Sequence, residues 1–265
     1  MPLTQAIGGA TIDWLAYVGS LARLTGGAAR ALVLDPFRGR RVRWSRSVHQ
    51  AMAVGVEAIP VVSLISFFVG LILALQAAYE LRRLGAIHLV AGAVALSVTR
   101  ELGPLMTAVV VVGRSGSAFA AEIGTMKVNE EIDALQTMAL EPLHFLVAPK
   151  LVAMLVMMPC LTTWSDFMGV VGGGVFGVLS AGFTWHTYLQ ATVDAMVSRD
   201  IFIGLVKSAM FAIVITAVGC QEGFSTGLGS EEVGKSTTAA VVKSIFLVVV
   251  MDLVFTSIFY LTAPR

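Results

Sequence analysis

Long runs of apolar residues, separated by short polar segments, make up most of the chain after residue 57. A helix needs about 20 predominantly apolar residues to cross the hydrocarbon core of a bilayer, so runs of this length are typical of transmembrane helices. The pattern predicts five such helices, over residues 58–79, 88–113, 151–180, 201–221 and 244–262. The fold class that we expect is therefore an all-α membrane protein.

The first 34 residues have a different pattern. Apolar side chains recur there at steps of three and four residues, and Arg23 and Arg30 lie on the opposite side of the helix. An amphipathic helix of this kind lies in the membrane interface rather than across the membrane. We expect such a helix over residues 2–34, ended by Asp35-Pro36 because proline does not continue a helix.

A basic segment follows, with five arginines among the nine residues from Arg38 to Arg46. Arginine clusters beside membrane spans mark the cytoplasmic side. We therefore divide the chain into an interfacial and basic segment, residues 1–46, and a transmembrane domain, residues 47–265. With the basic segment inside, five spans place the N-terminus in the cytoplasm and the C-terminus outside. Arg82-Arg83 then falls on the outer side, against the rule.

The composition agrees with a membrane protein and argues against several other classes. Hydrophobic residues make up 57% of the chain and charged residues 13%, whereas soluble domains carry about a quarter charged residues. The net charge of +1 gives no case for a nucleic-acid partner. Cys160 and Cys220 are isolated within apolar runs, and the four histidines have no metal-binding spacing. We expect inert thiols and no metal or other cofactor on this chain.

Charged residues interrupt four of the five predicted spans: Arg100-Glu101 in the second, Asp166 in the third, Lys207 in the fourth and Asp252 in the fifth. Ionisable side chains within a membrane are costly, and they usually pair, face the bundle interior or line a pathway. Arg100, Glu101, Lys207 and Asp252 are expected at similar depths, and the depth of Asp166 is less defined. Two interpretations stay open: ion pairs that pack the helices, or a gate or lipid-headgroup site.

Residues 97–150 contain the most informative motifs. Arg100-Glu101 places an ion pair inside the second span, and Pro104 distorts the same helix. Residues 113–124 are dense in small side chains, which allow helices in lipid to approach closely. The same reasoning applies to the third span, where glycines four residues apart between Gly169 and Gly177 predict close helix packing, with a dimer seam as the alternative.

Residues 127–138 are predicted to form a short, polar, cytoplasmic helix between two spans. Its acidic residues are Glu130, Glu131 and Asp133, and these leave Ile132 and Leu135 on another side. A short charged helix between spans is what a membrane protein would offer to a soluble motor protein. An ordinary solvated loop is the alternative, and the residues alone do not decide between the two.

The run from Gly229 to Ser236 satisfies the pattern G-x-x-x-x-G-K-[ST], which is typical of phosphate-binding loops. Such a loop needs a buried strand before it and a soluble helix after it. Here a predicted membrane span precedes the run, and the next span follows it directly. Glu231 and Glu232 would also repel a triphosphate. We therefore expect no nucleotide binding at Lys235.

Several of these motifs together resemble the MlaE/YrbE permease family in order and spacing. The resemblance covers residues 45–262 and rests on Arg100-Glu-Leu-Gly-Pro, Gly113-Arg-Ser-Gly-Ser-Ala, Ala121-Glu-Ile-Gly, Glu130-Glu-Ile-Asp-Ala-Leu, Glu141-Pro, Gly204-Leu-Val-Lys-Ser and the stretch from Gly234 to Val242. The family has a similar Gly-x-x-Thr-Thr pattern at the last of these positions. The phosphate-loop pattern is then a coincidence.

The resemblance implies the permease subunit of an ABC-type lipid transporter of the inner membrane, a subunit that is not itself an enzyme. It further implies that two copies of the chain pair with two ATPase subunits, which bind ATP and Mg, and with an MCE-domain substrate-binding protein. By the same resemblance, the helix at 127–138 is the coupling helix, and Glu130, Glu131, Asp133 and Leu135 contact the ATPase. Phospholipid is the favoured cargo, a sterol is the alternative, and the direction of transport is open.

Two other classes of function are considered. A proton-coupled secondary transporter would use Glu101, Lys207 and Asp252 as a relay, but such folds commonly carry internal repeats and none is seen in this sequence. An intramembrane enzyme would need a nucleophile with its base, or a metal cluster, and the sequence shows no such constellation.

Overall fold

The computed structural model describes residues 3–34 and 44–262, and this part of the chain is helical almost throughout. The basic segment between Arg38 and Arg43 lies outside the described residues. The α-helices are α1 Leu3–Leu34, α2 Trp44–Gly55, α3 Ile59–Arg83, α4 Val90–Ser97, α5 Gly103–Val111, α6 Ser117–Val128, α7 Glu131–Thr137, α8 Ala148–Ser180, α9 Trp185–Ala195, α10 Ser198–Ser225 and α11 Ser230–Thr262. Two 3-10 helices, Val56–Ala58 and Ile87–Leu89, and three π-helices, Val98–Leu102, Val112–Gly116 and Leu143–Val147, complete the described helices.

Five stretches of helix in the described residues are long and apolar enough to cross a membrane. They are Ser47–Arg83, Ile87–Val128, Leu143–Ser180, Ser198–Ser225 and Ser230–Thr262. The predicted all-α membrane protein with five spans is thereby confirmed. The helices extend beyond the apolar runs that predicted them, because backbone hydrogen bonding continues through polar residues outside the hydrocarbon core.

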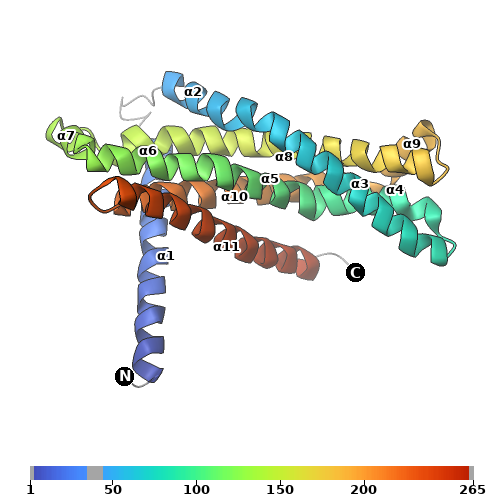
Figure 1. The fold of residues 1–265 in the computed structure, drawn as a ribbon, viewed down its shortest axis with the longest axis horizontal. Helices are drawn as coiled ribbons and strands as arrows, with labels where there is room; N and C mark the ends of the chain where they lie inside the picture. Colours follow the sequence, from blue (N-terminus) through green and yellow to red (C-terminus); the bar gives the residue numbers. More distant parts are fainter. Residues whose placement is uncertain (1–2, 35–43, 263–265) are drawn as a thin grey trace.

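The spanning helices lie side by side along the long axis of the molecule (Figure 1). The short helix α7 lies at one end of this bundle and α9 at the other, and we call these the α7 end and the α9 end. Helix α1 meets the bundle near the α7 end and points away from it, at a steep angle to the spanning helices (Figure 1). It is held there by Leu24 and Ala28, which pack in one apolar cluster with Ile132 and Cys220.

Glycines bring α3 and α8 into direct backbone contact. A Cβ added at Gly70 would overlap the carbonyl oxygen of Gly169, and one added at Gly172 would overlap that of Phe67. Larger side chains at these positions would push the two helices apart. The glycine pattern of the third span therefore packs helices within this chain, as the close-packing interpretation predicts.

The second span is not a uniform α-helix. Its α-helical segments α4, α5 and α6 are separated by two π-helical turns, Val98–Leu102 and Val112–Gly116. Pro104 lies in the first turn of α5, where its missing N–H and its ring disfavour a regular α-helix through the preceding turn. The π-helical turn accommodates the proline, and it changes the direction in which Arg100 and Glu101 point.

Candidate intramembrane charge site

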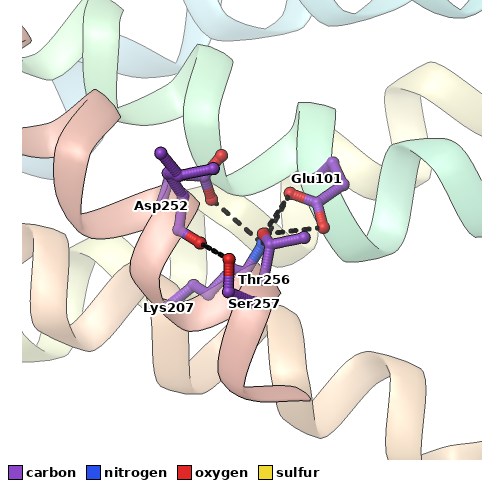
Figure 2. A network of polar contacts seen from close by, with 6 residues as sticks. Glu101, Lys207, Asp252, Thr256 and Ser257 are labelled. Atoms are coloured by element: carbon purple, nitrogen blue, oxygen red, sulfur yellow. Dashed lines mark hydrogen bonds and ion pairs between the residues drawn. The ribbon is translucent and has the colours of Figure 1, made fainter. Parts of the chain in front are cut away.

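The buried ammonium group of Lys207 is the centre of the site. Lys207 lies on α10, and its side chain is 0% exposed. Its Nζ lies 2.5 Å from Glu101 Oε2, 2.7 Å from Thr256 Oγ1 and 3.0 Å from Asp252 Oδ1 (Figure 2). A lone buried charge costs several kcal/mol, whereas a charge with opposite charges and hydrogen-bond acceptors around it is tolerated. The three partners explain how a lysine is accommodated inside the bundle.

Three spans contribute to this cluster. Glu101 comes from the π-helical turn of the second span, Lys207 from α10, and Asp252 and Thr256 from successive turns of α11. The Thr256 hydroxyl lies within hydrogen-bond distance of both Glu101 carboxylate oxygens, at 3.1 and 3.2 Å, so it joins the fifth span to the second. Figure 2 shows the side chains of Glu101, Asp252 and Thr256 converging on Lys207.

Arg100 is not paired with its neighbour Glu101, so that part of the sequence prediction is wrong. Its Nε and one terminal nitrogen each lie 2.7 Å from Asp200 Oδ1. Adjacent residues of a helix point in different directions, so Arg100 and Glu101 reach separate partners. The backbone N–H of Val197 donates to Asp200 Oδ2 at 3.1 Å, and this fixes the carboxylate at the start of α10.

Asp200 is a residue of the site that the sequence analysis missed. Its side chain is 2% exposed, although its position in the first turn of α10 resembles an ordinary acidic helix start. A carboxylate in the first turn of a helix is favoured by the helix dipole, which is why its sequence position gave no signal of a buried partner.

A cavity of about 230 Å³ opens beside the charge cluster, toward the α9 end. Glu101 and Asp252 retain side-chain exposures of 39% and 16%, so the two carboxylates are not sealed in the core. One part of the cavity wall is charged and the other is apolar or aromatic. The lining residues are Arg100, Glu101, Arg199, Asp200, Ile203, Lys207, Thr256, Phe259 and Tyr260.

Asp166 lies apart from the charge cluster. It packs against the π-helical turn from the side of α8, where a Cβ added at Gly103 would overlap its Oδ1. This oxygen is buried and has no hydrogen-bond partner within the described residues. The glycine of the Arg100-Glu-Leu-Gly-Pro motif thus provides the space that the Asp166 side chain occupies.

The predicted polar helix at 127–138 is shorter than expected. Lys127 belongs to the end of α6, where its ammonium group donates to the Phe224 carbonyl oxygen at 2.7 Å. The chain then turns at Glu130, whose φ of +58° is left-handed, and α7 begins at Glu131. The left-handed residue breaks the helix that the polar pattern predicted as continuous.

The side chains of α7 divide as the sequence analysis expected. Ile132 is 7% exposed and packs into the bundle, and Leu135 is half-buried. Glu130, Glu131 and Asp133 are exposed. The helix is therefore anchored on its apolar side and presents carboxylates at the surface.

The phosphate-loop pattern is part of a helix. Gly229 has a φ of +112°, and α11 begins at the next residue, so Gly234 and Lys235 lie inside the helix instead of before it. The ammonium group of Lys235 lies 3.1 Å from Glu231 and 2.8 Å from Glu232, both one turn earlier. The backbone there does not form the loop that cradles phosphates.

Comparison with known proteins decides the family. The family model described as "Permease MlaE" matches residues 47–258, which include α7 and the Lys207 cluster. The chain belongs to the MlaE permease family. The resemblance on which the sequence analysis relied is thereby confirmed.

The relatives of this MlaE family member include a "Probable ABC transporter permease protein" of Rickettsia felis. It is 35% identical over 258 residues, which cover 97% of this chain and 98% of the relative. A protein of the same description from Synechocystis sp. is 38% identical over 212 residues, covering 80% and 81%. "Protein TRIGALACTOSYLDIACYLGLYCEROL 1, chloroplastic" of Arabidopsis thaliana is 33% identical over 232 residues, covering 88% and 66%. The chain is an ABC transporter permease and a multi-pass membrane protein.

Proposed function

We propose that this MlaE family permease moves a lipid, with phospholipid as the favoured cargo, in a transporter driven by a separate ATPase subunit. The observation that carries the proposal is the mixed character of the cavity beside Lys207. A phospholipid has a charged headgroup and apolar chains, and the cavity presents charged side chains next to Ile203, Phe259 and Tyr260. The Arabidopsis relative also bears the name of a galactolipid, which supports a lipid as the class of cargo.

In this function the Lys207 cluster acts as a gate or as a headgroup site. Lys207 is paired with carboxylates on two other spans, so relative movement of α10 and α11 would separate charges inside the membrane. Separated charges there are costly, and an approaching headgroup would offer replacement partners. The ion pairs therefore hold α10 and α11 together until a polar headgroup replaces the lost partners of the separated charges.

The ATPase acts through α7, the coupling helix of the transporter. Its exposed carboxylates are available to a soluble partner, and Ile132 attaches the helix to the bundle. A movement of the partner would therefore be transmitted through α7 to the spanning helices. ATP and Mg belong to that partner, and this chain carries out no chemistry itself. The α7 end is then cytoplasmic, with α1 in the inner leaflet of the inner membrane and the C-terminus outside.

The complete transporter contains two copies of this chain and an MCE-domain substrate-binding protein. In this proposal, which follows the family resemblance, the second copy contacts α11, a spanning helix whose lipid-facing side has large apolar side chains at steps of three and four residues. These are Val242, Phe246, Val249 and Leu253. The lipid pathway of the transporter then lies between the two copies, and the cavity beside Lys207, lined in part by Thr256, Phe259 and Tyr260 of α11, forms one side of it.

A reconstitution experiment tests the proposal. The chain is purified with its co-purifying ATPase and placed in liposomes that contain either a labelled phospholipid or a labelled sterol. We expect ATP, but not ADP, to drive movement of the phospholipid, and mass spectrometry to find phospholipid retained by the complex. Absence of a co-purifying ATPase, or movement that follows a proton gradient without ATP, would favour secondary transport through Glu101, Lys207 and Asp252.

A further inference from the structure

A second and larger cavity, of about 660 Å³, lies at the α7 end. It is lined by residues of α2, α6, the coupling helix α7, the π-helical turn Leu143–Val147 and the first turn of α8. A volume of this size is within the range of about 300–1,000 Å³ that is typical of ligand pockets. The lining residues are His49, Gln50, Glu122, Met126, Glu131, Leu135, Phe145, Leu146, Pro149 and Lys150.

An ion pair between a buried lysine and a half-exposed glutamate forms part of the cavity wall. The side chain of Lys150 is 2% exposed, and its ammonium group contacts the Glu122 carboxylate and lies 4.7 Å from the centre of the Phe119 ring. The Glu122 side chain is 46% exposed, so its carboxylate also faces the open space. The positive charge of Lys150 is thus already compensated inside the protein, while Glu122 retains access to a further donor.

Contacts within the chain hold the walls of the cavity in place. Ile132 fixes α7 to the bundle, and Met126, Leu135 and Phe145 provide an apolar wall between the helices. A protein segment that enters this space would bury apolar surface without first having to move α7. Fixed pockets of this kind accept the anchoring side chains of protein interfaces.

The charge of the cavity selects the kind of side chain that it accepts. Glu122 and Glu131 contribute two negative charges to the lining and Lys150 one positive charge, which leaves an excess of one negative charge when His49 is neutral. Glu130, just before α7, and Asp133, within it, add two more exposed carboxylates. A long basic side chain would lay its methylene groups against the apolar wall and its cationic head against these carboxylates.

We propose that this cavity is a socket for a surface segment of the ATPase subunit that carries an arginine or lysine beside an apolar side chain. The inference rests on the proposed function, because it takes the ATPase as the partner of α7. It goes further in that the partner is held from inside the cavity, by residues of α2, α6 and α8, as well as on the outer surface of α7. The docking is then mutual: α7 contacts the ATPase, and the ATPase enters the permease.

Two tryptophan substitutions on α2 test the socket without altering α7. Gln50→Trp fills the cavity from its wall, whereas Val48→Trp adds the same side chain two residues away, at an exposed position that does not line the cavity. We expect Gln50→Trp to weaken binding of the co-purified ATPase about tenfold or more, and Val48→Trp to leave it within about twofold. Thermal unfolding of both variants in nanodiscs confirms that each is folded.

Charge substitutions at Gln50 test whether the side chain that occupies the cavity is positively charged. Gln50→Lys is expected to weaken ATPase binding about tenfold, whereas Gln50→Glu is expected to retain or strengthen it. Val48→Lys controls for a general effect of positive charge at this end of the molecule. Equal weakening by Gln50→Lys and Gln50→Glu, or equal weakening by the variants of Val48 and Gln50, would overturn the proposal of a basic side chain.

A photo-crosslinking amino acid at Phe145 identifies the occupant directly. The proposal expects a cross-link to an ATPase peptide that contains arginine or lysine, and no such product from the same label at Val48. A cross-link to the chain's own segment 38–43, to lipid alone or to no molecule would overturn it. Wild-type chain that binds no ATPase would instead overturn the proposed function, so the two failures are distinguishable.

Discussion

The hydroxyl group of Tyr17 donates a hydrogen bond to Glu222 Oε1 at 2.8 Å, and this contact attaches α1 to α10. Lys243 of α11 binds the same carboxylate, with its Nζ 2.8 and 2.7 Å from the two oxygens, and lies 4.7 Å from the centre of the Tyr17 ring. The Glu222 side chain is only 6% exposed. Three helices therefore meet at one buried carboxylate at the α7 end.

The substitution Tyr17→Phe isolates the contribution of the hydroxyl group, because the ring that contacts Lys243 is retained. A hydrogen bond to a charged group contributes about 1.5–3 kcal/mol, and Lys243 still compensates Glu222 after the substitution. We expect α1 to be held less firmly by about 1–2 kcal/mol. Protease cleavage within α1 should become faster, while the thermal unfolding of the spans changes little. A cleavage rate equal to that of wild type would contradict this role.

The same contact should make the attachment of α1 to the bundle weaker at alkaline pH. Burial, and then the hydrogen bond and charge of Glu222, raise the pKa of the Tyr17 phenol above its ordinary value of 10.0. A raised pKa in the folded state means that the contribution is complete below the unfolded value and is lost as pH rises above it. Protection of α1 from protease should therefore fall above about pH 10 in wild type and fall less in Tyr17→Phe.

Charge reversal on α7 tests the coupling helix. Glu131→Lys together with Asp133→Lys replaces two exposed carboxylates without touching Ile132, which fixes the helix. We expect loss of ATPase association with the spans still folded, because like charges at an interface suppress binding. The measurement is recovery of the ATPase when the permease is captured by affinity from detergent.

A matched control for α7 is available at the same end of the molecule. Glu231→Lys with Glu232→Lys reverses one exposed and one half-exposed carboxylate in the first turn of α11. This variant should retain the ATPase. Wild-type recovery of the ATPase by the α7 variant would show that α7 is not the contact.

Much of the architecture could be predicted from the pattern of residues alone, because apolar runs long enough to cross a bilayer leave few alternatives to a spanning helix. The depth of an intramembrane charge also follows from its position in a span. Lys207, Glu101 and Asp252 could therefore be grouped before their contacts were known.

Direction around a helix was harder to predict than depth. The π-helical turn before Pro104 changes the directions of Arg100 and Glu101, and no simple sequence signal gives the place of such a turn. Asp200 has the sequence position of an ordinary acidic residue in the first turn of a helix, so its pairing with Arg100 could not be predicted. Tyr17 and Glu222 are 205 residues apart, so the sequence gives no local signal of their contact. Pairings of this kind depend on how the helices are assembled in three dimensions.

The phosphate-loop pattern yields a prediction about nucleotide binding. Lys235 lies inside α11 and pairs with Glu231 and Glu232, so its ammonium group is not arranged to reach a triphosphate. Lys235→Ala should leave the ATP affinity of the transporter unchanged, as measured by equilibrium binding. Photolabelling of this chain by an azido-ATP analogue, with loss of the label in Lys235→Ala, would contradict the prediction.

The charge cluster predicts non-additive effects of substitution. Lys207→Ala leaves the carboxylates of Glu101 and Asp252 close together without their cation, and breaking a buried pair from one side costs about 3–5 kcal/mol. We expect Lys207→Ala to lower thermal stability strongly. Adding Asp252→Ala or Glu101→Ala removes one of the unpaired charges, so each double variant should recover part of the loss. Losses that simply add across both double-mutant cycles would exclude an energetic network.

Transport by the recovered double variants separates the two roles left for the cluster. If Lys207, Glu101 and Asp252 only pack the helices, a variant with restored stability should also move lipid at close to the wild-type rate. If the cluster is a gate or headgroup site, the same variant should remain folded and bind the ATPase, yet fail to move lipid, because the charges that respond to the headgroup have gone. ATP-dependent lipid movement in liposomes, measured beside thermal stability and ATPase binding, distinguishes these outcomes. We expect the folded, ATPase-binding variant to be inactive, because Lys207 and Glu101 line the cavity that a headgroup would enter.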